Sequence, residues 1–528
     1  MEGIGPGYLQ GNQDPEYPYL FGALNMVEHF RVDGLIHHPG VTTTLHDGLA
    51  AAAWHTLAGQ ADLATDLLQN SERYLLFLRW LHLAEYALLL FAAGAWVLWA
   101  TGRLSLALLL QMGPLVSLIT LWQDSFRVRP EAQLLLLAPL LGAYLAGYLL
   151  RPPEEAKGWR PAAALALLAS MLVATKITSL PLLLIPIMVL ITWRQRLVFC
   201  GLFAGFSALW LAPFWSRMVF FLRWSFKLAG HAGKYGSDPS VFNGDIFFSN
   251  LSALASSCSF YFLLVGLTAL AGILAAASNR EDRRLTRALL AVSAAQILAI
   301  FLVARSSPLA RYLVPTLSLC GLNLILLWLW SERTQPSRAR RLAMVAGVCV
   351  LWVGQIVHDG GESRRWMAEK QALAREHLTF EAAIAPRVRA TPTIHAQYSS
   401  SPAAATCFGL AYNPRLHQEF LRVYPQPLFY YSPFDRPPIM VTTEKKRQTL
   451  RDFAAGRLGW QIHLPLRFLP KGLLLTALAE SGGAEPEGLY RIDSLLDDPQ
   501  APAQVVNRAN GGRAAPSAGP RPEGESGD

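Results

Sequence analysis

The sequence predicts an all-α polytopic membrane domain of about ten transmembrane helices, followed by a small extracytoplasmic C-terminal α/β or α+β domain. The chain of 528 residues is 52% hydrophobic and only 16% charged, with a mean hydropathy of +0.28, which is too apolar for a soluble enzyme. The apolar residues gather in blocks of about 20, the length that crosses a hydrocarbon core of roughly 30 Å. Beyond residue 358 polar and apolar residues mix, which indicates a domain outside the membrane.

Residues 1–80 are predicted to be a first extracytoplasmic loop, because charged side chains recur along them. They lack the basic segment and apolar segment of a secretory signal peptide. The transmembrane domain, residues 81–357, contains the predicted spans 82–100, 104–122, 132–150, 161–175, 177–192, 198–214, 257–277, 287–304, 310–330 and 342–357. Lys176 separates two short spans, and Pro181 and Pro186 interrupt the second, so we expect broken helices around a cavity.

The basic residues between spans predict the orientation of the chain. One side of this topology collects Arg151, Lys157, Arg160, Arg194, Arg196, Arg280, Arg283, Arg284, Arg287, Arg333, Arg338, Arg340 and Arg341. The positive-inside rule assigns that side to the cytoplasm, so the net charge of +9 reports topology and not a nucleic-acid surface. The polar chemistry is then extracytoplasmic, and the composition rich in Ala, Leu and Arg favours a bacterial inner membrane.

The C-terminal third divides into a predicted domain and a predicted tail. In residues 358–499, the stretches TPTIHAQYS, CFGLAYN and PQPLFYYSPFD predict strands, and RRWMAEKQALAREHLTFEAAIA predicts an amphipathic helix. Residues 500–528 are Pro, Gly, Ala and charge, which cannot bury a core, so a disordered tail is expected.

Asp14 and Glu16 form the most informative motif, GNQDPEYPYLFGALNM, on the first loop. Two prolines stiffen its backbone, and Tyr17, Tyr19 and Phe21 are expected to form an aromatic rim. A carboxylate beside a cavity is suited to take a proton from an acceptor hydroxyl. The alternative is a solvated surface loop.

Charged residues near lipid form a second group of candidates. Arg127, Arg129 and Glu131 alternate, so an extended segment would point all three to one side. Charges at this depth usually face a protein interior or a wet cavity. They could position the acidic loop or bind phosphate, or form an ion-pair cluster at the interface. Lys176 is a second cation for a lipid phosphate, or a lysine that reaches the interface along its aliphatic stem.

Arg311 and Tyr312 lie at the mouth of a span, with Pro315 one turn further in. A guanidinium offers a planar fork that matches a phosphate, and near lipid this interaction is less screened than in water. The alternative is a basic interfacial anchor beside a tyrosine of the aromatic belt.

Histidines are the remaining candidates. His37 and His38, in the run HHPG, could contact a sugar or phosphate, share a metal with Asp14, or form an exposed turn. His46 and His55 lie nine residues apart, close to one face of a predicted helix. Without a third partner they are not assigned as metal ligands. A divalent metal stays open as a cofactor, with its ligands unknown.

The order of these motifs resembles the GT-C superfamily of integral-membrane glycosyltransferases, which includes protein O-mannosyltransferases and aminoarabinose transferases. The resemblance rests on the acidic DPEY motif, the many spans, the Arg-Tyr-x-x-Pro motif at Arg311 and the external C-terminal domain, and it covers roughly residues 10–360. It implies a polyprenyl-phosphate sugar donor and an extracytoplasmic acceptor. By the resemblance, Asp14 is the base, Arg311 holds the donor phosphate, and attack inverts the anomeric centre.

Two other classes stay open: a transporter or flippase of lipid-linked sugars, and a non-catalytic protein of envelope assembly. The chain also departs from the GT-C pattern, because the family generally has a span before the acidic loop and only 13 residues precede Asp14 here. We therefore expect that a first transmembrane helix is missing. The donor sugar and the nature of the acceptor, whether lipid, glycan or protein, are not legible in the sequence.

Overall fold

The fold was analysed in a computed structural model. It describes residues 16–32, 40–114, 127–233, 238–278, 282–334, 338–391, 393–396, 402–424, 429–431, 439–441, 446–448, 460–465, 473–480, 487–496 and 503–507. The chain divides into two compact units that do not follow sequence order. We call residues 26–51 and 76–364 the helical unit, and residues 1–25, 52–75 and 365–528 the sheet unit.

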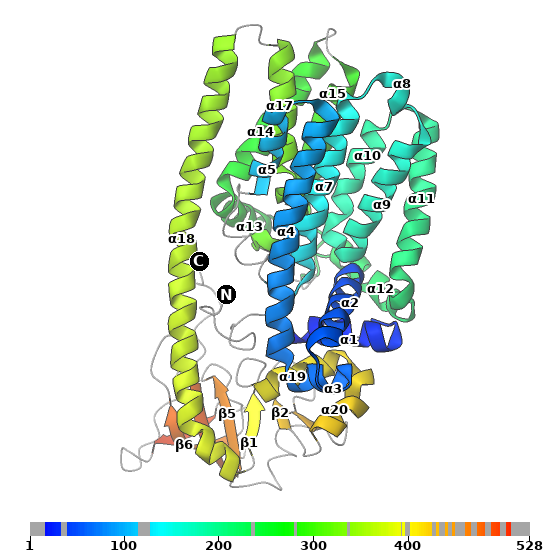
Figure 1. The fold of residues 1–528 in the computed structure, drawn as a ribbon. Helices are drawn as coiled ribbons and strands as arrows, with labels where there is room; N and C mark the ends of the chain where they lie inside the picture. Colours follow the sequence, from blue (N-terminus) through cyan, green and yellow to red (C-terminus); the bar gives the residue numbers. More distant parts are fainter. Residues whose placement is uncertain are drawn as a thin grey trace. The chain divides into compact units, whose positions relative to one another are not determined.

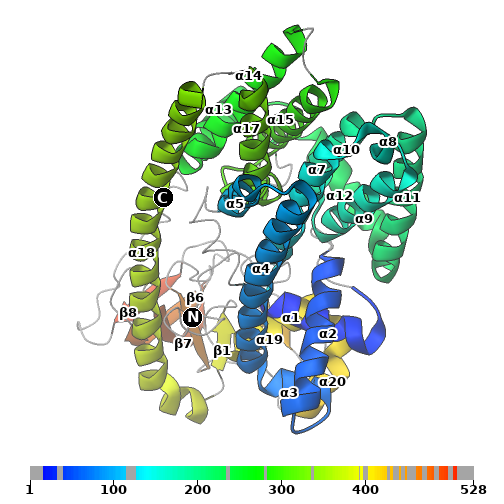
Figure 2. The ribbon, with the colours of Figure 1, turned by 45° about the horizontal axis from the view of Figure 1, so that its top comes forward.

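The helical unit is a bundle whose helices are joined mostly by short connections (Figures 1 and 2). Its main helices are α5 (Leu104–Met112), α7 (Pro130–Leu150), α8 (Pro153–Ala156), α9 (Trp159–Thr175), α11 (Trp193–Leu211), α12 (Met218–Gly230), α13 (Gly244–Ser257), α14 (Ser259–Ala277), α15 (Arg283–Ala304) and α17 (Cys320–Thr334). Within it, α9 packs against α7 and α11, and α14 against α15 and α17. Four further helices belong partly to each unit: α1 (Tyr17–His29), α2 (Val41–Ala58), α4 (Ser71–Thr101) and α18 (Arg338–Ala390).

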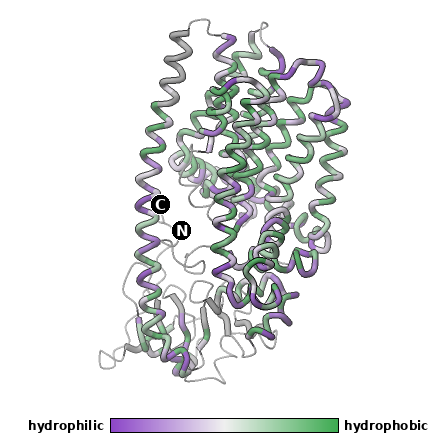
Figure 3. The backbone as a smooth tube through the Cα atoms, viewed as in Figure 1, coloured by the Kyte–Doolittle hydropathy of each residue, from purple (hydrophilic) through white to green (hydrophobic). Residues whose placement is uncertain are grey.

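The helical unit has the composition of a multi-pass membrane domain. Among the described residues, five helices are long and apolar enough to cross a membrane, or up to six if a bent pair counts as one span. Figure 3 shows hydrophobic residues along the bundle helices and hydrophilic ones around α8. The described part of the chain is thus mostly helical with several helices that are candidates to span a membrane, and the number of ten spans stays a prediction.

The predicted breaks around Lys176 are confirmed. Helix α9 ends at Thr175, Lys176 is extended with φ −158° and ψ 133°, and the 3₁₀ helix η4 (Ile177–Leu183) and α10 (Leu184–Val189) follow. The prolines lack the N–H that a continuous α-helix needs. A second break comes from η6 (Ala310–Leu313) and α16 (Val314–Leu317), which meet α17 at a 45° bend.

The sheet unit holds an eight-stranded sheet among its described residues, in the order β4-β3-β2-β1-β5-β7-β6-β8. The strands are β1 (Thr393–Ala396), β2 (Phe429–Tyr431), β3 (Ile439–Val441), β4 (Lys446–Gln448), β5 (Gln461–Pro465), β6 (Leu473–Glu480), β7 (Glu487–Leu495) and β8 (Gln504–Asn507). Strand β1 is parallel to both β2 and β5, and Ile394 pairs with Phe429 and Ile462. Helices α3 (Leu63–Gln69), α19 (Pro402–Tyr412) and α20 (His417–Val423) complete the unit, and Figure 1 marks them near β1 and β2.

Three expectations for this unit were wrong. All of CFGLAYN except its last residue is helical and belongs to α19. There Gly409 lies against Phe21, and a Cβ added at Gly409 would lie 2.5 Å from the Phe21 ring. Tyr17, Tyr19 and Phe21 form no rim, because at 1%, 4% and 0% exposure they are buried. The tail predicted for residues 500–528 begins too early, because Gln504–Asn507 form β8, which pairs in parallel with β6.

Candidate active site

Glu131 and Lys176 form a buried ion pair in the helical unit. Glu131 Oε1 accepts a hydrogen bond from Lys176 Nζ, and the two residues are 3% and 2% exposed. Pro130 begins α7 and so places Glu131 in its first turn, while the break after α9 places Lys176. Burying two charges is costly unless they pair. The packing of α7 against α9 therefore strongly favours the contact between Glu131 and Lys176.

Arg311 and Tyr312 lie at the same place. Lys176 Nζ is 4.9 Å from the centroid of the Tyr312 ring, and the Arg311 guanidinium is 5.3 Å from it. The positive charges of Lys176, Arg311 and Arg129 all act on the Glu131 carboxylate. These groups bring three positive charges and one negative charge into one region of low exposure, an arrangement suited to an anion.

The predicted alternation of Arg127, Arg129 and Glu131 on one extended segment is wrong. Only the two arginines precede the helix; Glu131 is helical, because Pro130 supplies the fixed φ of a first helical position. Arg127 and Arg129 are nevertheless buried, 6% and 3% exposed, which agrees with charges that face a protein interior.

An apolar groove of about 200 Å³ adjoins these charges through Tyr312. Its lining includes Ile177, Leu180, Leu228, Leu302, Arg305 and Tyr312. Leu180 and Leu302 are 42% and 39% exposed, so the groove lies at apolar surface of the helical unit. It therefore continues from a hydrophobic surface to the phenol ring that Lys176 and Arg311 contact.

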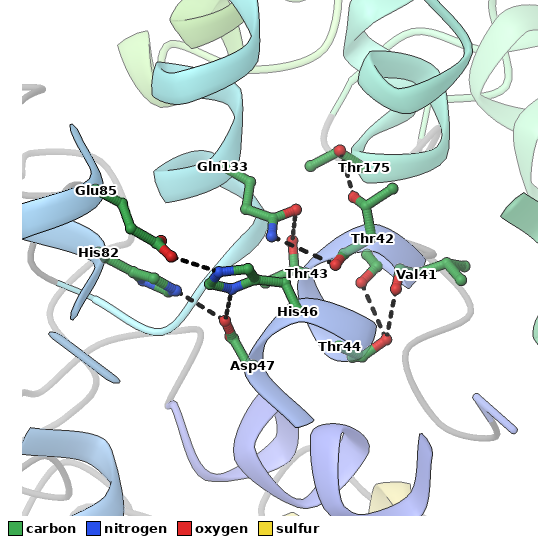
Figure 4. A network of polar contacts seen from close by, with 11 residues as sticks. Val41, Thr42, Thr43, Thr44, His46, Asp47, His82, Glu85, Gln133 and Thr175 are labelled. Atoms are coloured by element: carbon green, nitrogen blue, oxygen red, sulfur yellow. Dashed lines mark hydrogen bonds and ion pairs between the residues drawn. The ribbon is translucent and has the colours of Figure 1, made fainter. Parts of the chain in front are cut away.

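The first turn of α2 is bonded to the helices that carry the ion pair (Figure 4). Thr42 Oγ1 lies 2.5 Å from Thr175 Oγ1, which itself donates to the Met171 carbonyl, so Thr42 is the donor. Thr43 donates to Gln133 Oε1 at 3.3 Å, and Gln133 Nε2 donates to the Thr42 carbonyl at 3.3 Å. The start of α2 is thereby fixed beside Lys176 and Glu131.

One turn further along α2, His46 and Asp47 meet α4. Asp47 Oδ1 lies 2.8 Å from both His46 Nδ1 and His82 Nε2, and His46 Nε2 lies 2.8 Å from Glu85 Oε1 (Figure 4). Asp47 and His82 are 1% and 2% exposed, so the network is largely removed from water. The partner that His46 lacked in the sequence is therefore His82, and not His55.

The electrostatics of α2 follow from these contacts. Burial lowers the pKa of His46, but its hydrogen bonds and charge interactions with Asp47 and Glu85 outweigh burial and raise the pKa to about 10. Burial raises the pKa of Asp47, but the contacts with His82 and His46 lower it by more. The pKa of Asp47 therefore lies below its usual value. The two carboxylates thus favour the charged form of His46, and the histidines favour the charged form of Asp47.

The remaining predicted residues lie outside the described residues or in the sheet unit. Asp14, His37 and His38 lie outside the described residues. Glu16 is described, is 1% exposed and belongs to the sheet unit, where its carbonyl accepts from Leu20 N at the start of α1. Gly40, the last residue of HHPG, has a φ of 51°, a conformation that favours glycine, and α2 begins directly after it.

Sequence reasoning missed Asp47, His82, Glu85 and Gln133. Two signals could have indicated them: the adjacent His46 and Asp47, and the spacing of three residues between His82 and Glu85, which places both on one helix face. Polar side chains at the start of an otherwise apolar helix are costly without partners.

No protein-family model matches the sequence, and no curated protein matches it. Solved structures do: the crystal structure of ArnT from Cupriavidus metallidurans in the apo state has a TM-score of 0.50 and 12% identity, over 94% of this chain and 96% of ArnT. The chain has the fold of ArnT.

A second crystal structure of ArnT, bound to undecaprenyl phosphate, has a TM-score of 0.45 and 13% identity, over 92% of this chain and 95% of that one. At these identities the likeness concerns the fold. The predicted resemblance to an aminoarabinose transferase is confirmed for the fold alone.

Proposed function

We propose that this chain is an extracytoplasmic-facing glycosyltransferase of a bacterial inner membrane that moves a sugar from a polyprenyl-phosphate donor to a lipid, glycan or protein acceptor. The observation that carries the proposal is the apolar groove that Tyr312 lines, because Lys176 and Arg311 contact the ring of that tyrosine. A polyprenyl phosphate has the same two parts, a long apolar chain and an anionic head. The ArnT fold supports the same class of reaction by analogy.

The groove would bind the lipid chain of the donor, and the cations would bind its phosphate. Apolar side chains such as Leu180 and Leu302 would contact the isoprenoid chain, whose burial stabilises the complex by about 25 cal/mol per Å². Arg311 would clamp the phosphate with its planar fork, with Lys176 and Arg129 adding positive charge. The pair with Glu131 would hold Lys176 in place between turnovers.

The proposed reaction is a single displacement. The acceptor oxygen or nitrogen attacks the anomeric carbon, the bond from that carbon to the phosphate oxygen breaks, and its electron pair leaves with the phosphate. The acceptor proton passes to Asp14 as general base. Attack opposite the phosphate inverts the anomeric centre. Because the leaving phosphate is stable as an anion, the cations around Lys176 need only stabilise the charge that develops on it.

The test compares four strains of the source cell: wild type, a deletion, and the deletion complemented with Asp14→Asn or with Glu28→Gln. Glu28 is an exposed carboxylate of α1 and serves as the matched control. Mass profiles of envelope glycans and of polyprenyl-phosphate sugars are the readout. We expect deletion to remove one glycan decoration and to accumulate its lipid-linked sugar, with restoration by Glu28→Gln but not by Asp14→Asn.

Two outcomes would count against this function. Restoration by Asp14→Asn would remove the assigned base. Accumulation of an unchanged lipid-linked sugar on the cytoplasmic leaflet alone would instead indicate a flippase, because a transporter moves the lipid-linked sugar while a transferase consumes it.

A further inference from the structure

Three side chains of the α2–α4 contact converge on one point. The ligand atoms that His46, Asp47 and His82 can offer all lie within 4.8 Å of one another. Two imidazole nitrogens, His46 Nδ1 and His82 Nε2, face the same carboxylate oxygen at 2.8 Å each. Imidazole nitrogen and carboxylate oxygen are ligands that zinc prefers in proteins.

We propose that His46, Asp47 and His82 bind a zinc ion that fastens α2 to α4. Ligand atoms around tetrahedral zinc lie roughly 3.3 Å apart, so small rotations of side chains that are already in place would open room for the ion. Binding would release the protons that His46 Nδ1 and His82 Nε2 share with Asp47, because only a deprotonated imidazole nitrogen ligates a metal. The 18 residues of α2 and the 31 residues of α4 provide rigid supports on either side. The fourth position would be open to water, since His46 has 30% side-chain exposure.

Glu85 supplies the outer contact that zinc-binding histidines usually have. Its Oε1 lies 2.8 Å from His46 Nε2, so the imidazole is held with Nδ1 toward Asp47. A carboxylate bonded to the far nitrogen of a ligating histidine fixes the ring and raises its basicity. The chain thus presents the carboxylate, histidine and metal order in which such sites are commonly built.

The second carboxylate oxygen of Asp47 is also available to a metal ion. Among the described residues, Asp47 Oδ2 is buried and has no hydrogen-bond partner. A carboxylate that bonds two imidazoles through one oxygen leaves its other oxygen buried without a partner, which costs free energy. A cation between the side chains would take up that second oxygen.

This zinc would act on the position of α2. Thr42 and Thr43, in the first turn of the same helix, bond Thr175 and Gln133 beside the Glu131–Lys176 pair. A metal one turn away would fix the register of α2 against the helices that carry the cations. The inference does not depend on the proposed glycosyl transfer, because it concerns binding and stability.

The experiment uses the full chain, purified in detergent, stripped with a chelator and then incubated with zinc chloride alone. Bound zinc is counted by mass spectrometry of the metal after gel filtration, in wild type, Asp47→Asn, His82→Gln and His55→Gln. His55 lies on α2 but bonds Asp66 and Tyr74, so it is the matched control. We expect about one zinc per chain in wild type and His55→Gln, and at most about a tenth of that zinc content in the other two.

Thermal unfolding of the wild type with and without zinc keeps the test independent of how the variants fold. Zinc should raise the unfolding temperature of wild type and His55→Gln, because an ion that binds only the folded state stabilises it. A wild type that takes up no zinc would show that the histidines and Asp47 form a polar network only. Equal zinc content in Asp47→Asn and wild type would place the metal elsewhere. Either result overturns the proposal.

Discussion

Thr42 donates a hydrogen bond of 2.5 Å to Thr175, the residue that immediately precedes the buried Lys176. The start of α2 and the break after α9 are therefore joined at the place where the cations gather. Helix α2 begins directly after Gly40, so the same bond also joins its first turn to the candidate active site.

Thr42→Val removes this bond and should lower the free energy of unfolding by about 1 kcal/mol. Thr175→Val should cost a similar amount, and the double variant should cost less than the sum, because both changes delete one shared interaction. Chemical unfolding in detergent measures all three. Thr56→Val, which loses only a bond to its own helix, is the control. Strict additivity of the two changes would show that the bond does not form.

Lys176→Met should destabilise the protein by roughly 3–5 kcal/mol, because the buried Glu131 carboxylate loses the lysine that donates its hydrogen bond and keeps only the charges of Arg129 and Arg311 nearby. The double variant Lys176→Met/Glu131→Gln removes both charges and should recover most of that loss. The measurement is the unfolding temperature of detergent-purified protein. If the double variant were less stable than Lys176→Met, the two charges would not be paired.

Gly321→Ala should destabilise the bundle strongly. An added Cβ would lie 2.4 Å from the Leu110 carbonyl oxygen, a backbone atom of α5 that cannot move alone. Gly266→Ala, in α14, meets nothing within 4 Å and should be neutral or stabilising by up to about 1 kcal/mol, because alanine favours a helix. Unfolding temperatures of the two variants compare the effects directly. Equal effects would contradict the close approach of α5 and α17.

Asp66 should make the sheet unit sensitive to acid. Burial raises its pKa, but hydrogen bonds from Tyr74 at 2.6 Å, Asn70 at 2.8 Å and His55 outweigh burial and hold the pKa below its usual value. The stabilisation is thus fully present above the unfolded pKa of about 3.9 and is lost as the pH falls through the lower folded value.

Unfolding temperatures between pH 7 and pH 2 would check this for wild type, Asp66→Asn and the exposed control Glu28→Gln. Asp66→Asn should be less stable at neutral pH and should lose less stability on acidification. Parallel pH curves for Asp66→Asn and wild type would contradict the assigned hydrogen bonds.

Part of the candidate site could be predicted from the sequence, because some of its residues are unusual in their local sequence context. Lys176 between two short apolar segments, prolines inside the second, and Arg311 before a proline each indicate a break or a charge that needs a partner. The structure confirms the breaks and brings Lys176, Arg311 and Tyr312 together.

The contacts between the residues of the site could not be predicted, because they join distant parts of the chain. Glu131 and Lys176 are 45 residues apart, and His82 lies 35 residues after Asp47, inside an apolar helix. CFGLAYN has apolar residues that suit a strand or a helix, and contact between Gly409 and Phe21, known only from packing, selects the helix. Pro130 begins α7 and so makes Glu131 helical, and this effect overrides the alternation of charges that the sequence presents.

The most direct test of the proposed donor site is binding of a polyprenyl phosphate to the purified chain, measured by native mass spectrometry. Arg311→Gln removes the proposed clamp, Arg194→Gln changes an exposed arginine elsewhere, and uncharged polyprenol tests the head group. We expect the phosphate to bind wild type and Arg194→Gln, with at least tenfold weaker binding to Arg311→Gln and to polyprenol in place of the phosphate. Equal binding of polyprenol and polyprenyl phosphate, or undiminished binding by Arg311→Gln, would contradict a phosphate site at these cations.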